Sequence, residues 1–325
     1  MGGCINNIII QTDFRIELLS TVIFLSDLDN DQFISKDETE YSRILGSEFN
    51  KYKNHQAVKI FPKLWEDGLR WDGVPQLALH LNNDLTKKFQ FSNELKSRFN
   101  NSYSGLTDFL KLINDFSEKS NFLSFYNKSL KLNESFLLKL HQILNKFQII
   151  KILENYLNIK LFKQKVMLSN LLKSSYGITI NVSKNNFEIF CIASKYWLNV
   201  ANSNGCLTRN LLSTIWHEFL HSIINPLSDK LFDDHLNLTD SQSEWYCELN
   251  ESIIWAITLR LLIKEKIVDE NNCNWYFNNA VNCGAPKTKE LNDLLIEYES
   301  NQSKYNNFRE FYPILQNEFG KPPRE

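Results

Sequence analysis

The sequence has no long apolar run, no excess of one charge and no close pairs of cysteine. The stretch Ile8 to Ile10 is too short to cross a membrane, so we expect no membrane span. Lys and Arg total 36 against 38 for Asp and Glu, and a net charge of −2 gives no long-range attraction to nucleic acid. The six cysteines are scattered along the chain, so we expect free thiols in a reducing compartment.

The first residues, Met1-Gly2-Gly3-Cys4, have neither the basic region nor the long apolar run of a signal peptide. We therefore expect a cytoplasmic protein. N-terminal acylation is not expected, because Asn6 stands where a myristoylation motif has Ser or Thr. The sequence also lacks a glycine-rich phosphate loop and a nucleophile elbow, which argues against nucleotide hydrolysis and serine-hydrolase chemistry.

The apolar residues of the first half recur at helical spacing from Asp13 to about Leu161. Between Lys165 and Ser194 the pattern changes to short β-type runs, and the last two of these runs suggest a hairpin. Helical spacing returns from Leu207. We expect an α+β fold with a helical N-terminal lobe (1–160) and a lobe with a small sheet and an active-site helix (161–325).

Two histidines, His217 and His221, are four residues apart within an apolar run. On a helix, both imidazole rings would leave the same face one turn apart and could converge on one metal ion. We expect Thr208 to cap the start of this helix and Asn225-Pro226 to end it, because the residue before a proline avoids the α region. The sequence therefore predicts a buried helix that carries a zinc site.

Glu218 follows the first histidine directly. In this position a carboxylate can reach a water molecule at the metal without binding the metal itself. Zinc lowers the pKa of such a water toward neutrality, and a carboxylate base can then take its proton as it attacks a carbonyl. This is the chemistry of peptide hydrolysis.

A catalytic zinc has three protein ligands and leaves the fourth position to water. The chain has no third histidine at HExxHxxGxxH spacing. The candidates for the third ligand are Asp233, Asp234, His235, Glu244, Glu248 and Glu251. The next predicted helix carries Glu244, Glu248 and Glu251 on one stripe. Burying this acidic stripe is costly unless it meets a cation. A solvated face is the alternative, and periodicity alone does not choose between Glu248 and Glu251.

Several short stretches occur in a fixed order along the chain: Phe14 to Leu19, Asn54 to Val58, Trp71-Asp72, Leu77 to His80, Tyr176-Gly177, His217 to His221, Asn225 to Leu227, Asn250-Glu251, Ala256 and Arg260. Through them, as far as about Leu262, the chain resembles the domain-of-unknown-function family 4932, which is similar to the gluzincin class of HExxH peptidases. The resemblance implies a zincin-like core.

In that family pattern the glutamate of an Asn-Glu pair is the third zinc ligand, which implies Glu251 here. Trp255 departs from the pattern, because the family tends to have a basic residue there and thermolysin-like enzymes have an aspartate that orients a histidine. The group that stabilises the transition state is left open between Tyr176, His235 and Tyr246.

A second acidic segment runs from Asp27 to Glu38. Asp27, Asp29, Asp31 and Glu38 occupy positions 1, 3, 5 and 12 of an EF-hand loop, which is typical of Ca²⁺ binding. However, Gln32 stands where the loop needs glycine, and no partner loop is visible. We expect a polar loop between helices, with a structural calcium site as the alternative.

The motif as a whole predicts a zinc-dependent metallopeptidase, a hydrolase of peptide or protein substrates, with His217, His221 and Glu251 as ligands and Glu218 as base. The alternative is a non-catalytic, zinc-stabilised binding protein derived from a peptidase. Glu218 favours the enzyme, because a purely structural site has no use for it.

Overall fold

A computed structural model describes residues 8–26, 28, 32–36, 39–97, 103–161, 163–183, 186–199, 203–234 and 237–323 of the chain. By their contacts, the residues form two compact units. The sheet unit comprises Ile8–Asn145 and Lys163–Ala201, and the helical unit includes Lys146–Phe162 and Asn202–Glu325. The sheet therefore groups with the N-terminal helices, whereas the sequence-based division placed it with the C-terminal lobe.

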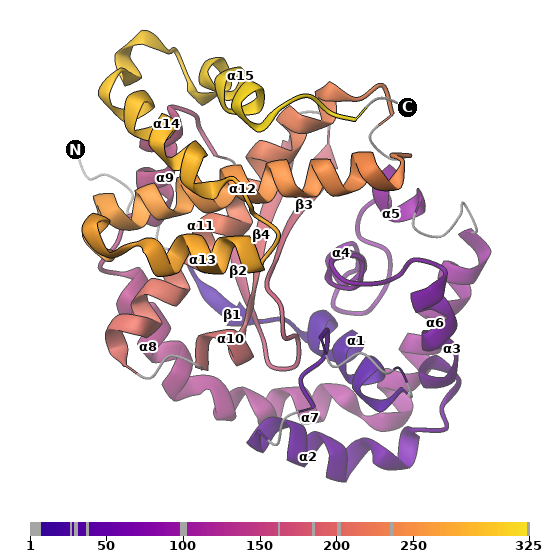
Figure 1. Ribbon diagram of the computed structural model, residues 1–325. Helices are drawn as coiled ribbons and strands as arrows, with labels where there is room; N and C mark the ends of the chain where they lie inside the picture. Colours follow the sequence, from indigo (N-terminus) through magenta and orange to yellow (C-terminus); the bar gives the residue numbers. More distant parts are fainter. Residues whose placement is uncertain are drawn as a thin grey trace. The chain divides into compact units, whose positions relative to one another are not determined.

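The sheet unit contains a four-stranded mixed sheet in the order β1-β2-β4-β3 (Figure 1). Its strands are β1 (Ile10–Thr12), β2 (Lys163–Ser169), β3 (Tyr176–Ser183) and β4 (Asn186–Ser194). The pairs β1/β2 and β2/β4 are parallel, and β3/β4 is the expected antiparallel hairpin. The α+β class, the small sheet and the hairpin are thus confirmed, while β1 was not expected as a strand.

In the sequence, the helices of the sheet unit lie between β1 and β2 and after β4. They are α1 (Phe14–Leu25), α2 (Glu40–Phe49), η1 (Asn50–Tyr52), α3 (Gln56–Glu66), α4 (Gly73–Leu79), α5 (Asn93–Ser97), α6 (Tyr103–Ser120), α7 (Phe122–Ser129), η2 (Leu130–Asn133), α8 (Glu134–Leu144) and α10 (Lys195–Asn199). All the residues of α1 except Phe24 are buried, which is typical of a helix at the centre of a core.

Two charged residues of α1 are satisfied inside this core. Arg15 pairs with Asp13, the residue that caps the helix, and also donates to the carbonyl of Leu81. Glu17 accepts hydrogen bonds from the backbone and side-chain N–H groups of Asn170 at 2.9 and 3.2 Å, and burial raises its pKa. The charged residues in the Phe14 to Leu19 stretch therefore fasten α1 within the unit.

The helical unit contains no strand among its described residues. Its elements are α9 (Ile149–Leu157), α11 (Asn204–Ser228), η3 (Asp229–Leu231), α12 (Asp240–Lys264), η4 (Glu270–Asn272), α13 (Asn274–Asn282), α14 (Thr288–Ser300), η5 (Gln302–Lys304) and α15 (Phe308–Phe319). The two longest, α11 and α12, pack against each other, and α14 packs against α12 (Figure 1).

The ends of α11 differ from those expected. Ser203 rather than Thr208 caps its start, with the side chain accepting a hydrogen bond from the backbone of Cys206. Pro226 does not end the helix, which continues to Ser228. The N–H of Asp229 still donates to the carbonyl of Asn225, so the last turn keeps its helical hydrogen bond around the proline.

The start of α12 is fixed by a capping box. The Thr239 side chain accepts from the backbone N–H of Gln242, whose own side chain accepts from the backbone N–H of Thr239. Further along, Arg260 forms a two-point ion pair with Glu299 of α14 and a second pair with Glu270. These contacts hold α12 at both ends.

None of the helices in the described residues is long and apolar enough to cross a membrane.

Candidate metal centre

The two motif histidines lie on α11, which is largely buried from Leu211 to Leu220. Leu212, Ile215, Trp216, Phe219 and Leu220 have no exposed surface, and the indole N–H of Trp216 donates to the carbonyl of Ile149 at 3.1 Å. The helix is therefore held firmly in the unit. His217 and His221 leave it one turn apart, and their ring centroids are 5.0 Å from each other.

Glu251 of α12 meets both histidines. Its Oε2 lies 3.4 Å from Nε2 of His217, and its Oε1 lies 3.5 Å from Nε2 of His221. One ligand atom from each of the three residues lies within 4.8 Å of the other two. Among the side chains that the structure describes, no other three His, Cys, Asp or Glu residues form such a group.

These distances fit a tetrahedral zinc ion. Zinc binds imidazole nitrogen and carboxylate oxygen at about 2.0–2.1 Å, so two ligands of a tetrahedral ion stand about 3.3 Å apart. The two His–Glu distances are close to this value. The donor set of two imidazoles and one carboxylate also suits zinc. The side chains are 18%, 20% and 28% exposed for His217, His221 and Glu251, so the group is partly open to solvent.

The charges of these three side chains depend on one another. Burial opposes the charged form of Glu251, but His217 and His221 outweigh it and lower its pKa to about 2. Burial likewise opposes protonation of His217, yet the carboxylate of Glu251 raises its pKa above the usual value. For His221 burial dominates, and its pKa is lowered. The carboxylate of Glu251 thus stays anionic beside the two imidazoles, an arrangement that suits a bound metal cation.

His221 is oriented by the end of its own helix. Its Nδ1 lies 3.4 Å from Oδ1 of Asn225, one turn further along. Because the amide oxygen can only accept, this contact favours the tautomer with the proton on Nδ1 and leaves Nε2 free to face Glu251. The Asn225-Pro226 segment was expected only to end the helix; its side chain also positions a histidine.

A buried polar network fixes Asn250, the residue before Glu251. The hydroxyl of Ser228, at the end of α11, donates to Oδ1 of Asn250 and lies 2.7 Å from the hydroxyl of Tyr312 on α15. Ser228 and Asn250 are both almost completely buried. The network therefore sets the register of α12 against α11 and, with it, the position of Glu251.

Glu218 is buried, with 7% of its surface exposed, and follows His217 on α11. Its negative charge contributes to the raised pKa of His217, which places the carboxylate within electrostatic range of that ring. It does not belong to the group of three convergent side chains. Its role as the base stays a prediction from the sequence.

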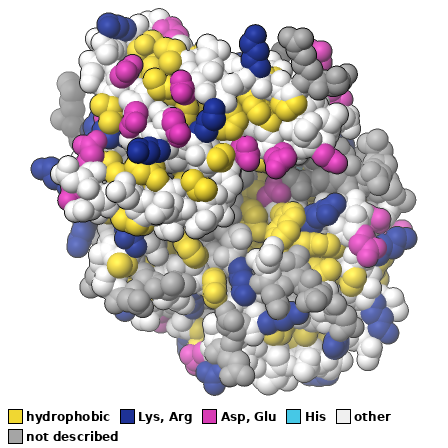
Figure 2. Space-filling view, in the orientation of Figure 1, with side chains coloured by type: hydrophobic (Ala, Val, Ile, Leu, Met, Phe, Trp, Pro, Cys, Tyr) yellow, Lys and Arg dark blue, Asp and Glu magenta, His cyan; other side chains and the backbone are white. Residues whose placement is uncertain are grey.

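The acidic stripe of α12 divides into two parts. Asp240 and Glu244 are exposed and Glu248 is half-buried, and acidic side chains form a row over the N-terminal half of α12 (Figure 2). Glu251, further along the helix, is the member that meets the histidines. The solvated-face alternative thus describes the start of the stripe, whereas its last member turns inward.

The other candidates for transition-state stabilisation are Tyr246, Tyr176 and His235. The hydroxyl of Tyr246 donates to Asp229 at 2.7 Å, and burial together with that carboxylate raises its pKa. Tyr176 lies at the start of β3 in the sheet unit, where its ring is 6.2 Å from that of Phe33. His235 lies outside the described residues, as do the four acids of the expected calcium loop, Asp27, Asp29, Asp31 and Glu38.

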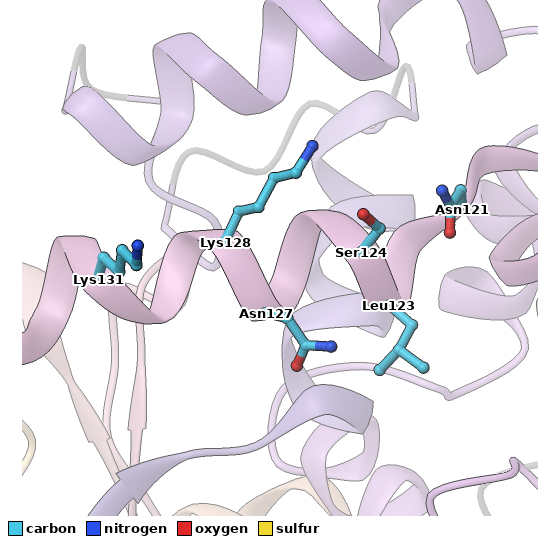
Figure 3. A pocket seen from close by; sticks show the side chains of 6 residues that line it. All are labelled: Asn121, Leu123, Ser124, Asn127, Lys128 and Lys131. Carbon is cyan, nitrogen blue, oxygen red and sulfur yellow. The ribbon is translucent and has the colours of Figure 1, made fainter.

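A surface depression of the sheet unit offers different chemistry. It is lined by Asn121, Leu123, Ser124, Asn127, Lys128 and Lys131, all from one stretch along α7 and η2 (Figure 3). These side chains include amides, a hydroxyl and amines but no carboxylate, imidazole or thiol. The depression therefore provides no metal ligand set.

Fold and site together define an α+β protein with a cluster of two histidines and a glutamate on neighbouring helices. The family model described as Domain of unknown function (DUF4932) matches residues 8–317. The chain belongs to this family. No curated protein and no solved structure matches the sequence.

Proposed function

We propose that this protein is a zinc-dependent metallopeptidase in which His217, His221 and Glu251 hold the metal. The observation that carries the proposal is the convergence of these side chains at His–Glu distances of 3.4 and 3.5 Å, which suits a tetrahedral ion. Their partial exposure supports a catalytic rather than a closed structural site, because a substrate must reach the fourth position.

Zinc bound there would lower the pKa of water and polarise a peptide carbonyl. Glu218 accepts the proton of the attacking water and later delivers it to the leaving amine nitrogen. Asn225 keeps Nε2 of His221 directed at the site. Asn250 and Ser228 hold Glu251 in register with the two histidines.

The positions of the ligands along the chain support a gluzincin-like arrangement within a zincin-like core. The HExxH motif lies on one long helix and the third ligand on the next, and these helices pack together. The substrate is a peptide or protein. Trp255 takes the place of the aspartate that orients a histidine in thermolysin-like enzymes, so the surroundings of the ligands differ from that pattern.

The test is a peptide-library digest with zinc-loaded wild type, Glu218→Gln and, as a matched control on α12, Glu248→Gln. We expect wild type and Glu248→Gln to cleave, and Glu218→Gln to bind zinc equally well but to lose at least about 100-fold in rate, as removal of a general base does. If all three bind zinc and none cleaves, the metal site stands and the peptidase proposal fails, in favour of the non-catalytic binding protein.

A further inference from the structure

Trp255 lies one turn beyond Glu251 on α12 and contacts the proposed zinc ligands. Its ring centroid is 5.8 Å from that of His217, with the two rings at 79°, an edge-to-face arrangement. Its side chain also interacts with the carboxylate of Glu251, one turn earlier on the helix. A single side chain therefore contacts two of the three proposed ligands.

Tyr276 of α13 packs against the indole. The ring of Tyr276 lies 5.0 Å from that of Trp255 at 65°, and its hydroxyl donates to the carbonyl of Trp255 at 3.3 Å. Tyr276 is buried and packs against Trp275, over which the guanidinium of Arg209 lies at 4.7 Å. Because Arg209 belongs to α11, the row of side chains starts and ends on the helix that carries His217.

The chemistry of the indole suits this position. Tryptophan has a donor and no acceptor, so its N–H can orient a carboxylate but cannot compete with it for a cation. The large apolar ring also keeps water away from one side of the ligands, which strengthens the electrostatic interactions there. An aspartate at the same place would instead add a second negative charge beside Glu251.

We propose that Trp255 is a positioning residue of the metal centre, which holds the Glu251 carboxylate and the His217 ring in the geometry that binds zinc. The proposal rests on the proposed zinc site and adds to it a ligand-orienting group of a different chemical kind. It assigns α13 a function as well, because Tyr276 supports the indole.

The test compares zinc affinity in wild type, Trp255→Phe and Trp245→Phe by competition with a chelator. Phenylalanine keeps an aromatic ring and removes the N–H. Trp245 is the matched control, because it lies on the same helix and packs against Phe232 and Phe319. We expect Trp255→Phe to bind zinc about 10- to 100-fold more weakly, as loss of a ligand-orienting partner does, with Trp245→Phe unchanged.

A merely structural role would leave two further measurements unmoved. The visible spectrum of the Co²⁺ form reports ligand geometry, and we expect it to change in Trp255→Phe but not in Trp245→Phe. In wild type with ¹⁵N-labelled indoles, we expect one N–H resonance to shift strongly when zinc is added. This measurement needs no variant and therefore answers the question even if Trp255→Phe fails to fold.

Equal zinc affinity and equal Co²⁺ spectra in the two variants would overturn the assignment of Trp255 while leaving the zinc site intact. If no indole N–H resonance of wild type shifts when zinc binds, the assignment of Trp255 is likewise overturned and the zinc site stands. Wild type that fails to bind zinc at all would overturn both proposals together.

Discussion

Nε2 of His217 lies 3.4 Å from Oε2 of Glu251, although the two residues come from different helices. The contact depends on α11 and α12 keeping their register, because one helical residue more or less would turn the carboxylate away from the ring by about 100°. The buried Ser228–Asn250 hydrogen bond fixes that register. Ligand geometry and helix packing are therefore parts of one arrangement.

The first prediction concerns the choice of glutamate. Glu251→Gln removes the anionic ligand, and we expect zinc affinity to fall by more than about 100-fold, beyond the loss seen for orienting partners. Glu248→Gln, which changes a glutamate on the same stripe of α12, should bind zinc as wild type does. Competition titration with a chelator measures both. If Glu248→Gln loses more zinc affinity than Glu251→Gln, the assignment of Glu251 as the third ligand is wrong.

The second prediction concerns Asn225. Asn225→Ala removes the acceptor opposite Nδ1 of His221, so the ring loses its fixed tautomer. We expect zinc affinity to fall by about 10-fold while the far-ultraviolet circular dichroism spectrum stays unchanged. Asn279→Ala, at an exposed position of α13, is the control. An affinity equal to wild type would mean that the Asn225 contact does not orient the ligand.

The third prediction concerns the pH dependence of the metal-free protein. The pKa of Glu251 is lowered, so its contribution to stability is present above its unfolded pKa of about 4.3 and is lost as the pH falls toward 2. The pKa of His217 is raised, so its contribution is present below about 6.5 and is lost as the pH rises through its higher folded value. The pair therefore stabilises most between about pH 4.3 and 6.5.

Thermal melts of metal-free wild type and Glu251→Gln at about pH 3 to 9 test this window. The difference in Tm should be largest inside the window and should shrink on both sides. Glu248→Gln is the control and should follow wild type throughout. A difference that grows steadily above about pH 7 would contradict the assignment of the ion pair.

The fourth prediction concerns the network between α11, α12 and α15. Ser228→Ala removes the donor to Asn250 and a partner of Tyr312, all in a buried position. We expect the free energy of unfolding to fall by about 1–3 kcal/mol. Urea unfolding measures the change, and Ser300→Ala, an exposed serine that bonds only within α14, should cost less than about 0.5 kcal/mol. Equal losses would show that the network does not stabilise the unit.

The sequence pointed to His217, His221 and Glu218 through local spacing, because residues one turn apart share a face wherever the helix lies. Periodicity left Glu248 and Glu251 equivalent, since both occupy the same stripe. Their difference arises from the packing of α12 on α11, which brings Glu251 to the histidines, whereas Glu248 is half-buried and outside the convergent group. Local pattern carries no information on such a register.

Other parts of the fold were hidden for related reasons. β1 is three residues long, and its partner β2 follows more than a hundred residues later, so no local alternation marks it. The helix α13, which carries Tyr276, is short and rich in asparagine, a poor helix former. Because α13 was not expected, the surroundings of Trp255 could not be predicted. The end of α11 was misplaced, because the last helical turn tolerates Pro226.

The most direct test of the proposed centre is zinc X-ray absorption spectroscopy on the metal-loaded full chain. We expect one zinc per chain, with only nitrogen and oxygen neighbours at about 2.0–2.2 Å and with the outer-shell scattering of two imidazole rings. Glu218→Gln should give the same spectrum, and Glu251→Gln should not. A sulfur neighbour at about 2.3 Å, or wild type that holds no stoichiometric zinc, would contradict the proposed zinc centre.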